Sequence, residues 1–247
     1  MKKTLLIAAA ALAAGMLSVQ AQSNVYSQNV VGYVNITVPN NKYVILANQL
    51  NTGSNTLNNV ISAGAVDSDT TILYFKDGVF KQFIYYDAIN GNSPDGNAGW
   101  YDLLANTPCT NTLSPGDAVF VHNSSGAAIN LSTVGSVQTG TNLITIPTGY
   151  SMRSFPMPVG GTSIDNLGFV GVDSQDYLLM WNGTSYDQYI YYDAVNGNSP
   201  DGNAGWYGLL SNIPMNTNSA AWPKVGNGFF INHVAPSQTW TNIAVIP

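Results

Sequence analysis

The sequence contains no glutamate and few charged residues of any kind. All thirteen acidic residues are aspartates, and charged residues make up 8% of the 247 positions, against about 25% in ordinary soluble domains. Without glutamate, the HExxH zinc-protease motif and the bidentate ligand that closes an EF-hand calcium loop are both excluded. The polar character of the chain comes instead from asparagine, serine, threonine and glycine.

Basic residues and cysteine are also scarce. Beyond residue 21 there are five lysines and arginines against thirteen aspartates, so the net charge of that part is 5 − 13 = −8. Binding to a phosphate backbone requires clustered basic residues, and we therefore expect no nucleic-acid partner. The single cysteine, Cys109, cannot form an intramolecular disulfide, and we interpret it as a small packed residue rather than a nucleophile.

The N-terminus has the pattern of a secretory signal peptide. Two lysines at positions 2 and 3 precede an apolar stretch over residues 4–18, and residues 19–21 offer a small-residue cleavage site. We predict that residues 1–21 are removed and that the protein is secreted, to the periplasm, the cell surface or the extracellular space. No later run approaches the ~20 apolar residues of a membrane helix, so we expect no membrane span in the mature chain.

The chain contains an internal repeat. Residues 85–101 read YYDAINGNSPDGNAGWY and residues 191–207 read YYDAVNGNSPDGNAGWY, an offset of 191 − 85 = 106. Further on, GDAVFVHN from Gly116 pairs with GNGFFINH from Gly226, an offset of 226 − 116 = 110, so the second copy has a four-residue insertion between these two blocks. The sequence therefore predicts two copies of one unit, with a signal peptide at 1–21, repeat 1 at 22–138 and repeat 2 at 139–247.

Each copy is expected to be all-β. Short runs rich in Val, Ile, Tyr, Phe and Thr alternate with Asn, Gly and Pro turns, which indicates antiparallel strands. The expected strands cover residues 34–38, 43–47, 70–75, 79–86, 118–122 and 128–131 in the first copy, and residues 143–146, 177–181, 186–192 and 228–232 in the second. We predict two tandem β-sandwich or barrel-like repeats, packed as separate domains or as one pseudo-symmetric body. Single helical turns are expected only at residues 57–60, 101–104 and 164–167.

Several segments together resemble a known group of proteins. The opening VYSQNVVGYVNITVP, the closing GNGFFINH with the following Trp240, and the paired copies are similar to secreted β-rich repeat proteins of verrucomicrobial and related bacteria. The first copy departs from the closing pattern, because Ala118 stands where a second glycine is expected. The resemblance implies an exported all-β fold and implies no activity.

The repeated loop is a candidate cation site. It offers carboxylate and amide oxygens, which Ca²⁺ prefers, from Asp87, Asn90, Asn92 and Asp95 and again from Asp193, Asn196, Asn198 and Asp201. Their spacing matches no EF-hand loop. The alternative is that Asn-Gly, Pro-Asp-Gly and Ala-Gly only form turns, in which Asn and Asp side chains bond their own backbone.

Aromatic residues beside the loop suggest a second kind of site. Trp100 and Tyr101, with Trp206 and Tyr207 in the second copy, border a loop of amides and carboxylates, and flat rings beside polar groups suit the face of a sugar. The competing interpretation is that alternate aromatic residues on a strand belong to the core. Adjacent strand residues such as Tyr85 and Tyr86 must point to opposite faces, so at most one of each pair is expected to be exposed.

No motif in the sequence predicts catalysis. A GxSxG elbow, a phosphate-binding loop and a dinucleotide fingerprint are all missing from the sequence, and the only histidines, His122 and His233, do not align between the copies. We therefore interpret the protein as an exported non-enzymatic module that binds an extracellular glycan, Ca²⁺ or its own copies through sheet edges. A secreted carbohydrate-active enzyme, using a pair of aspartates, is the alternative.

Overall fold

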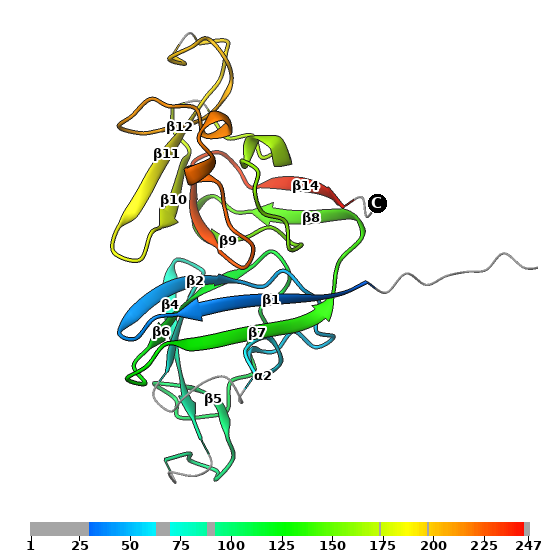
Figure 1. Cartoon of the computed structure of the whole chain (residues 1–247), viewed down its shortest axis with the longest axis vertical. Coiled ribbons are helices and arrows are strands. Elements are labelled where there is room, and N and C mark those ends of the chain that lie inside the picture. The colour runs from blue at the N-terminus through cyan, green and yellow to red at the C-terminus, as the bar shows by residue number, and fades with distance from the viewer. Residues whose placement is uncertain (1–29, 63–69, 88–91, 173, 197, 245–247) are drawn as a thin grey trace, which may run out of the picture.

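The chain folds into four antiparallel sheets that form two similar pairs, one pair for each copy of the repeat (Figure 1). The computed structural model describes residues 30–62, 70–87, 92–172, 174–196 and 198–244. The all-β prediction is confirmed, and the four sheets of the described residues are open rather than closed into a barrel. The predicted signal peptide at 1–21 lies outside the described residues.

The first copy consists of a five-stranded sheet and a two-stranded ribbon. The sheet has the order β2-β6-β3-β4-β5 and the ribbon pairs β1 with β7. The strands are β1 (Val31–Val38), β2 (Lys42–Ala47), β3 (Thr71–Lys76), β4 (Val79–Tyr86), β5 (Gly99–Asp102), β6 (Ala118–Asn123) and β7 (Ile129–Ser136), with a helical turn α2 (Leu57–Val60).

The second copy repeats this topology with β8 to β14 in place of β1 to β7. Its sheet has the order β9-β13-β10-β11-β12 and its ribbon pairs β8 with β14. The strands are β8 (Gly140–Ile146), β9 (Gly149–Arg153), β10 (Tyr177–Trp181), β11 (Tyr186–Tyr192), β12 (Gly205–Gly208), β13 (Phe229–His233) and β14 (Gln238–Ala244), with 3₁₀ turns η2 (Asp165–Leu167), η3 (Met215–Thr217) and η4 (Ser219–Ala221). None of the helices in the described ranges has the length and apolar character needed to cross a membrane.

Most expected elements are present, and one is wrong. The helical turn at 57–60 and the strands at 79–86, 177–181 and 186–192 are confirmed with these bounds. The helical turn expected at 101–104 is a correction: Tyr101 belongs to β5, where it pairs with Ile84 of β4, and a hydrogen-bonded turn follows. Backbone pairing with the neighbouring strand outweighs the weak local preference for a helical turn.

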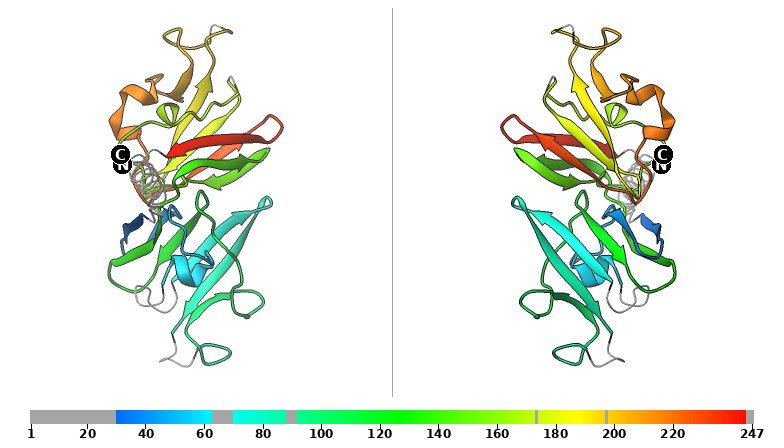
Figure 2. Two further views of the ribbon diagram at one scale, coloured as in Figure 1. Left: turned by 90° about the vertical axis from the view of Figure 1, so that its right-hand side faces the viewer. Right: turned by 90° about the vertical axis from the view of Figure 1, so that its left-hand side faces the viewer.

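Each five-stranded sheet buries one face against the ribbon of its own copy (Figure 2). In β6, Val119 and Val121 point into this core together with Leu131 of the ribbon. In the second copy Phe229 and Ile231 take the corresponding places, with Trp240 from the ribbon. These cores follow the two-residue alternation of strands.

The opposite faces of the two sheets meet each other and form a third core. Phe120 of β6 and Phe230 of β13 lie with their ring centroids 6.0 Å apart. Ile45, Ala118 and Met152 complete the buried cluster, and side chains from β3 and β10 pack around it. The central strands β6 and β13 are therefore covered on both faces, which explains why they are almost continuously hydrophobic.

The edge strands β2 and β9 each pair with the other copy at their C-terminal ends. Gly228 donates its N–H to the carbonyl of Ile45 at 3.0 Å, and Ala47 donates to the carbonyl of Gly226 at 2.8 Å. On the other edge, Arg153 forms a backbone bridge with Asp117 and an ion pair with its carboxylate at 3.1 Å. The C-terminal ends of these two edge strands are thus paired within the chain.

We expect Phe230→Ala to lower the free energy of unfolding by about 3–5 kcal/mol, the usual cost of removing a buried phenylalanine ring. Urea denaturation followed by tryptophan fluorescence measures this loss. Tyr33→Ala is the control, because Tyr33 is 69% exposed on β1 and its loss should change stability by less than about 0.5 kcal/mol. Equal losses in the two variants would show that the core between the copies does not stabilise the fold.

Candidate functional site

The repeated loop is closed by a tyrosine hydroxyl in the same way in both copies. The Tyr101 hydroxyl donates to Asp95 Oδ1, and Ser93 Oγ lies 2.9 Å from the hydroxyl and 3.0 Å from the carboxylate oxygen. In the second copy the Tyr207 hydroxyl donates to Asp201 Oδ1 at 2.5 Å. These side chains belong to the nearly identical block, so the hydrogen bonds of the loop explain much of its identity in the two copies.

The two loop aspartates act as acceptors for their own turns. The backbone N–H of Asn97 donates to Asp95 Oδ1, and that of Asn203 donates to Asp201 Oδ1, both at 3.0 Å. The hydrogen bond from Tyr101 is the main reason that the pKa of Asp95 falls to about 2, and the pKa of Asp201 is lowered in the same way by Tyr207. An aspartate that accepts the backbone N–H two residues further on forms an Asx-turn, as the turn interpretation of the loop predicts.

The structure brings only some of the predicted cation ligands together. In the second copy, Asn196 donates its backbone N–H to Asp193 Oδ1 at 2.8 Å and its side-chain amide to Asp193 Oδ2, also at 2.8 Å. Asn90 lies outside the described residues. Within the described ranges, no three His, Cys, Asp or Glu side chains converge on one point. Calcium binding by Asp87, Asn92, Asn198 and the other loop residues stays a prediction.

The predicted aromatic ligand residues lie in the core. Trp100, Tyr101, Trp206 and Tyr207 are each no more than 2% exposed. The indole of Trp100 donates to the carbonyl of Ile61, and that of Trp206 to the carbonyl of Phe169, both at 3.1 Å. The two tryptophans have equivalent environments, as the repeat predicts. Buried rings offer no face to a sugar in this structure. These four residues instead anchor the repeated loops to the core.

The two repeated loops also point away from each other. They follow β4 and β11, and Figure 1 shows them at opposite ends of the long axis of the molecule. The loops therefore do not build one shared site.

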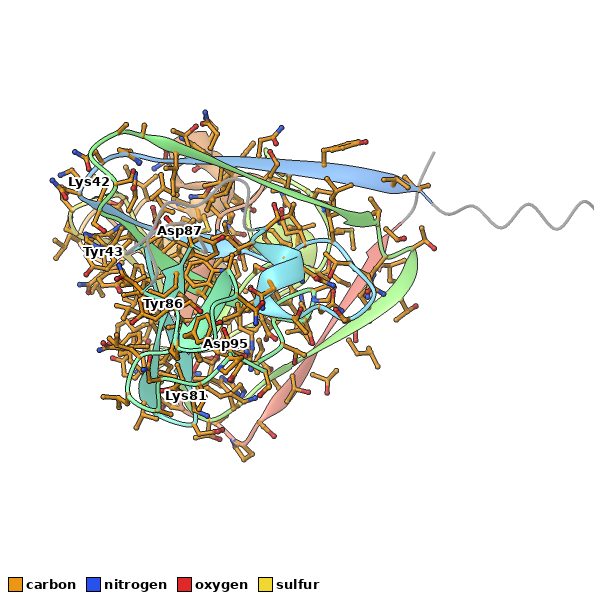
Figure 3. All side chains as sticks on the ribbon, turned by 90° about the horizontal axis from the view of Figure 1, so that it is seen from below. Lys42, Tyr43, Lys81, Tyr86, Asp87 and Asp95 are labelled. Atoms are coloured by element: carbon orange, nitrogen blue, oxygen red, sulfur yellow. The ribbon has the colours of Figure 1, made fainter. Side chains whose placement is uncertain are left out.

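A cleft of about 540 Å³ lies instead between the two copies. The first copy contributes Thr37, Pro39 and residues 42–45, and the second contributes residues 180–184, Asp187, Tyr189, residues 220–222, Lys224, Asn227 and Gly228. Lys42 and Tyr43, at the start of β2, lie at the margin of the molecule, far from Lys81 (Figure 3). A concave site of this size, with apolar rings and a few polar groups, is typical of small-molecule binding sites.

One wall of the cleft comes from the insertion in the second copy. The connection from β12 to β13 carries the four extra residues of the second copy, and it forms η3 and η4. Trp222 follows η4 and lines the cleft, and its indole donates to the carbonyl of Met215 at 2.7 Å. The first copy has a shorter connection here, so the repeat does not require a second cleft of the same form.

Three aromatic rings of the cleft, one from the first copy and two from the second, are held in place by hydrogen bonds or stacking. The indole of Trp181 in β10 donates to the carbonyl of Tyr43 at 2.8 Å and so joins the two copies directly. The ring of Tyr43 stacks on His122 with centroids 4.3 Å apart, while Tyr43 remains 37% exposed. Together with Trp222, these contacts fix the rings before any ligand arrives.

The polar groups of the cleft form a small network of their own. Asn182 donates from its side-chain amide to Asp187 Oδ1 at 3.0 Å and accepts from the Thr184 hydroxyl at 3.1 Å. Lys42 and Lys224 are both exposed at the cleft. Sequence reasoning missed this site because its residues are far apart along the chain. The one signal available in the sequence was the four-residue insertion in the second copy, which lies close to Trp222.

The two histidines have structural surroundings. His233 Nδ1 lies 2.7 Å from Asp176 Oδ2 and its Nε2 lies 3.1 Å from the carbonyl of Pro236, with both side chains almost completely buried. Asp176 also accepts from the backbone N–H of Val234 at 2.9 Å. This pair ties β13 to the start of β10 and is closed to substrate. The two histidines are not equivalent between the copies. The position of His122 in the first copy is taken by Asn232 in the second, and the position of His233 is taken by Asn123 in the first.

A comparison of the chain with protein-family models, curated proteins and solved structures finds no match. The resemblance to secreted verrucomicrobial repeat proteins therefore stays a prediction.

The backbone N–H of the repeated tryptophan is bound by a charged side chain in one copy and by a neutral one in the other. In the second copy Asp165 Oδ1 accepts from the backbone N–H of Trp206 at 2.9 Å, and in the first copy Asn58 Oδ1 accepts from that of Trp100 at 3.0 Å. Asp165 Oδ2 is buried without a hydrogen-bond partner, and burial raises the pKa of Asp165 to about 6. The ionised carboxylate is therefore poorly solvated in the folded protein.

We expect Asp165→Asn to stabilise the protein at pH 7.5 and to have no such effect at pH 4. The folded pKa of about 6 lies above the unfolded value of about 3.9, so the folded state holds the proton more tightly. Stability is therefore lost as the pH rises from about 4 to about 6. Allowing for partial solvent screening, the gain at pH 7.5 should be about 1–2 kcal/mol.

Urea denaturation at the two pH values measures this difference, and Asn58→Asp is the matched control in the first copy. That variant should lose stability at pH 7.5 and not at pH 4. An Asp165→Asn variant as stable as the parent at pH 7.5 would contradict the assignment, and so would a gain of the same size at pH 4.

Proposed function

We propose that the protein is a non-catalytic binding module that is exported and holds a short glycan segment in the cleft between its two copies. The observation that carries the proposal is the set of fixed rings from Tyr43, Trp181 and Trp222 around one cleft of about 540 Å³. Sugars present flat apolar faces edged by hydroxyl groups, so they need aromatic surfaces beside hydrogen-bonding groups.

The polar side chains of the cleft supply those hydrogen bonds. The amide of Asn182, the hydroxyl of Thr184 and the carboxylate of Asp187 lie together along the β10–β11 hairpin. The Asn182 amide and the Thr184 hydroxyl donate and accept hydrogen bonds, and the Asp187 carboxylate accepts them, so the three groups can bind several sugar hydroxyls at once. The bonds among these three residues orient them in advance, which reduces the entropy lost on binding.

The composition of the cleft favours binding over hydrolysis. Glycosidases usually place two carboxylates on either side of the bond that breaks. Among the described residues that line the cleft, Asp187 is the one acidic side chain. A carbohydrate-active enzyme would need a second carboxylate at this place, whereas a binding module does not.

We expect Tyr43→Ala to weaken glycan binding by about tenfold or more, because anchoring aromatic residues commonly contribute 2 kcal/mol or more at binding sites. Affinity electrophoresis measures this loss in gels containing one soluble polysaccharide each. The panel contains hydroxyethylcellulose, galactomannan, xylan, polygalacturonate, alginate, dextran and dextran sulfate. The parent protein should be retarded by at least one of them.

The pseudo-symmetry of the chain offers a matched control. Tyr150 of β9 pairs with Asn232 as Tyr43 of β2 pairs with His122, and it is 52% exposed outside the cleft. Tyr150→Ala should leave retardation unchanged. The proposal fails if no polysaccharide in the panel retards the parent protein, or if Tyr43→Ala and Tyr150→Ala weaken retardation equally.

A further inference from the structure

We infer that the glycan held by this cleft is acidic, and that Lys42 and Lys224 bind its carboxylate or sulfate groups from the two sides of the cleft. This inference rests on the proposed function and specifies its ligand class. Lys42 begins β2 of the first copy, and Lys224 lies in the connection that precedes β13 of the second copy. The two ammonium groups reach the cleft only because the copies pack together.

The charge of the cleft is opposite to that of the protein. The described lining residues carry two lysines and one aspartate, which gives 2 − 1 = +1, whereas the whole chain carries a net charge of −6. A patch of charge opposite to that of its surroundings attracts a ligand of complementary charge and orients it. The acidic remainder of the protein repels an anionic polymer, so the cleft is the place where such a polymer can dock.

The other three basic side chains beyond residue 21, those of Lys76, Lys81 and Arg153, lie outside the cleft. Arg153 is engaged in the ion pair with Asp117, and the Lys76 ammonium lies 5.9 Å from the ring centroid of Tyr74. Within the described part of the chain, neither Lys42 nor Lys224 forms an ion pair. Two of the five basic residues of this part of the chain therefore lie in one cleft and are not neutralised by a carboxylate.

Asp187 fits the same assignment as a positioning group. It lies on the hairpin side of the cleft, where Asn182 holds its Oδ1 at 3.0 Å. A carboxylate at this place repels an acidic group and accepts hydrogen bonds from sugar hydroxyls. It therefore directs the acidic group of the ligand toward the lysines and the neutral edge of the sugar toward the hairpin.

The decisive experiment compares ligands that differ only in charge. Polygalacturonate is compared with its fully methyl-esterified form, and dextran sulfate with dextran, by affinity electrophoresis and by isothermal titration with the corresponding oligosaccharides. The parent protein should bind an acidic member at least about tenfold more tightly than its neutral counterpart. The two pairs distinguish a uronate from a sulfate ester as the source of the charge.

Variants then test the residues. The double substitution Lys42→Gln and Lys224→Gln should weaken binding of the acidic ligand about tenfold, to the level of the neutral counterpart, since two exposed ion pairs together contribute on the order of 1–2 kcal/mol. Binding of the neutral counterpart should be unaffected. Lys81→Gln is the matched control, because Lys81 is an exposed lysine of β4 outside the cleft. Asp187→Asn should strengthen binding of the acidic ligand, and 0.5 M NaCl should weaken it.

The possible failures separate the two proposals. Tighter binding of the neutral members overturns the acidic ligand and leaves glycan binding in place. An effect of Lys81→Gln equal to that of the double variant overturns the role of the cleft lysines. Absence of binding to every polymer overturns glycan binding itself, and a thermal scan of each variant shows whether it has kept the fold.

Discussion

The two copies of the repeat are joined where Gly228 lies against Ala118, and the rest of the molecule depends on this close contact. A Cβ atom at position 228 would lie 2.3 Å from the Cβ of Ala118, which is far too close for two carbon atoms. The glycine lets its own backbone reach the carbonyl of Ile45, so the edge of one sheet pairs with the other copy. Ala118 and Gly228 occupy equivalent positions in the two copies. The contact has room for the methyl group of Ala118 but not for a second one at position 228, which explains why only one of the two positions is a glycine.

The symmetry created by this contact is incomplete, and the differences between the copies are chemically informative. Asn123 of the first copy is replaced by His233, which pairs with Asp176, while Asn123 bonds the carbonyls of Val38 and Ala127. Both solutions satisfy a buried polar position at the end of equivalent strands. The insertion before Trp222 has no such equivalent, and it contributes one wall of the cleft between the copies, which is lined by four aromatic residues, Tyr43, Trp181, Tyr189 and Trp222.

The nearly identical block of seventeen residues has mainly a structural role in the described part of the molecule. Its tryptophans and its last tyrosines, Tyr101 and Tyr207, are buried. Asp95 and Asp201 cap their own turns, and the hydroxyls of these two tyrosines close the loops. Identity within one chain therefore marks a local structure that tolerates little change. The residues that line the cleft lie in segments where the copies differ, as expected if the two copies have taken different roles in one site.

By itself, the sequence determined the repeat, the all-β class, most strand positions and the turn chemistry of the loops, because these depend on short-range patterns and turn residues. It also placed Tyr85 and Tyr86 on opposite faces, and they do pack against different rings, Trp100 and Tyr101. Only the tertiary structure decided that these tryptophans and tyrosines are buried, since alternation does not say which face of a sheet meets water. The cleft likewise depends on the packing of the two copies, which brings Tyr43 to Trp181 across 138 positions of the chain; no local pattern encodes a contact that forms only when two folded units meet.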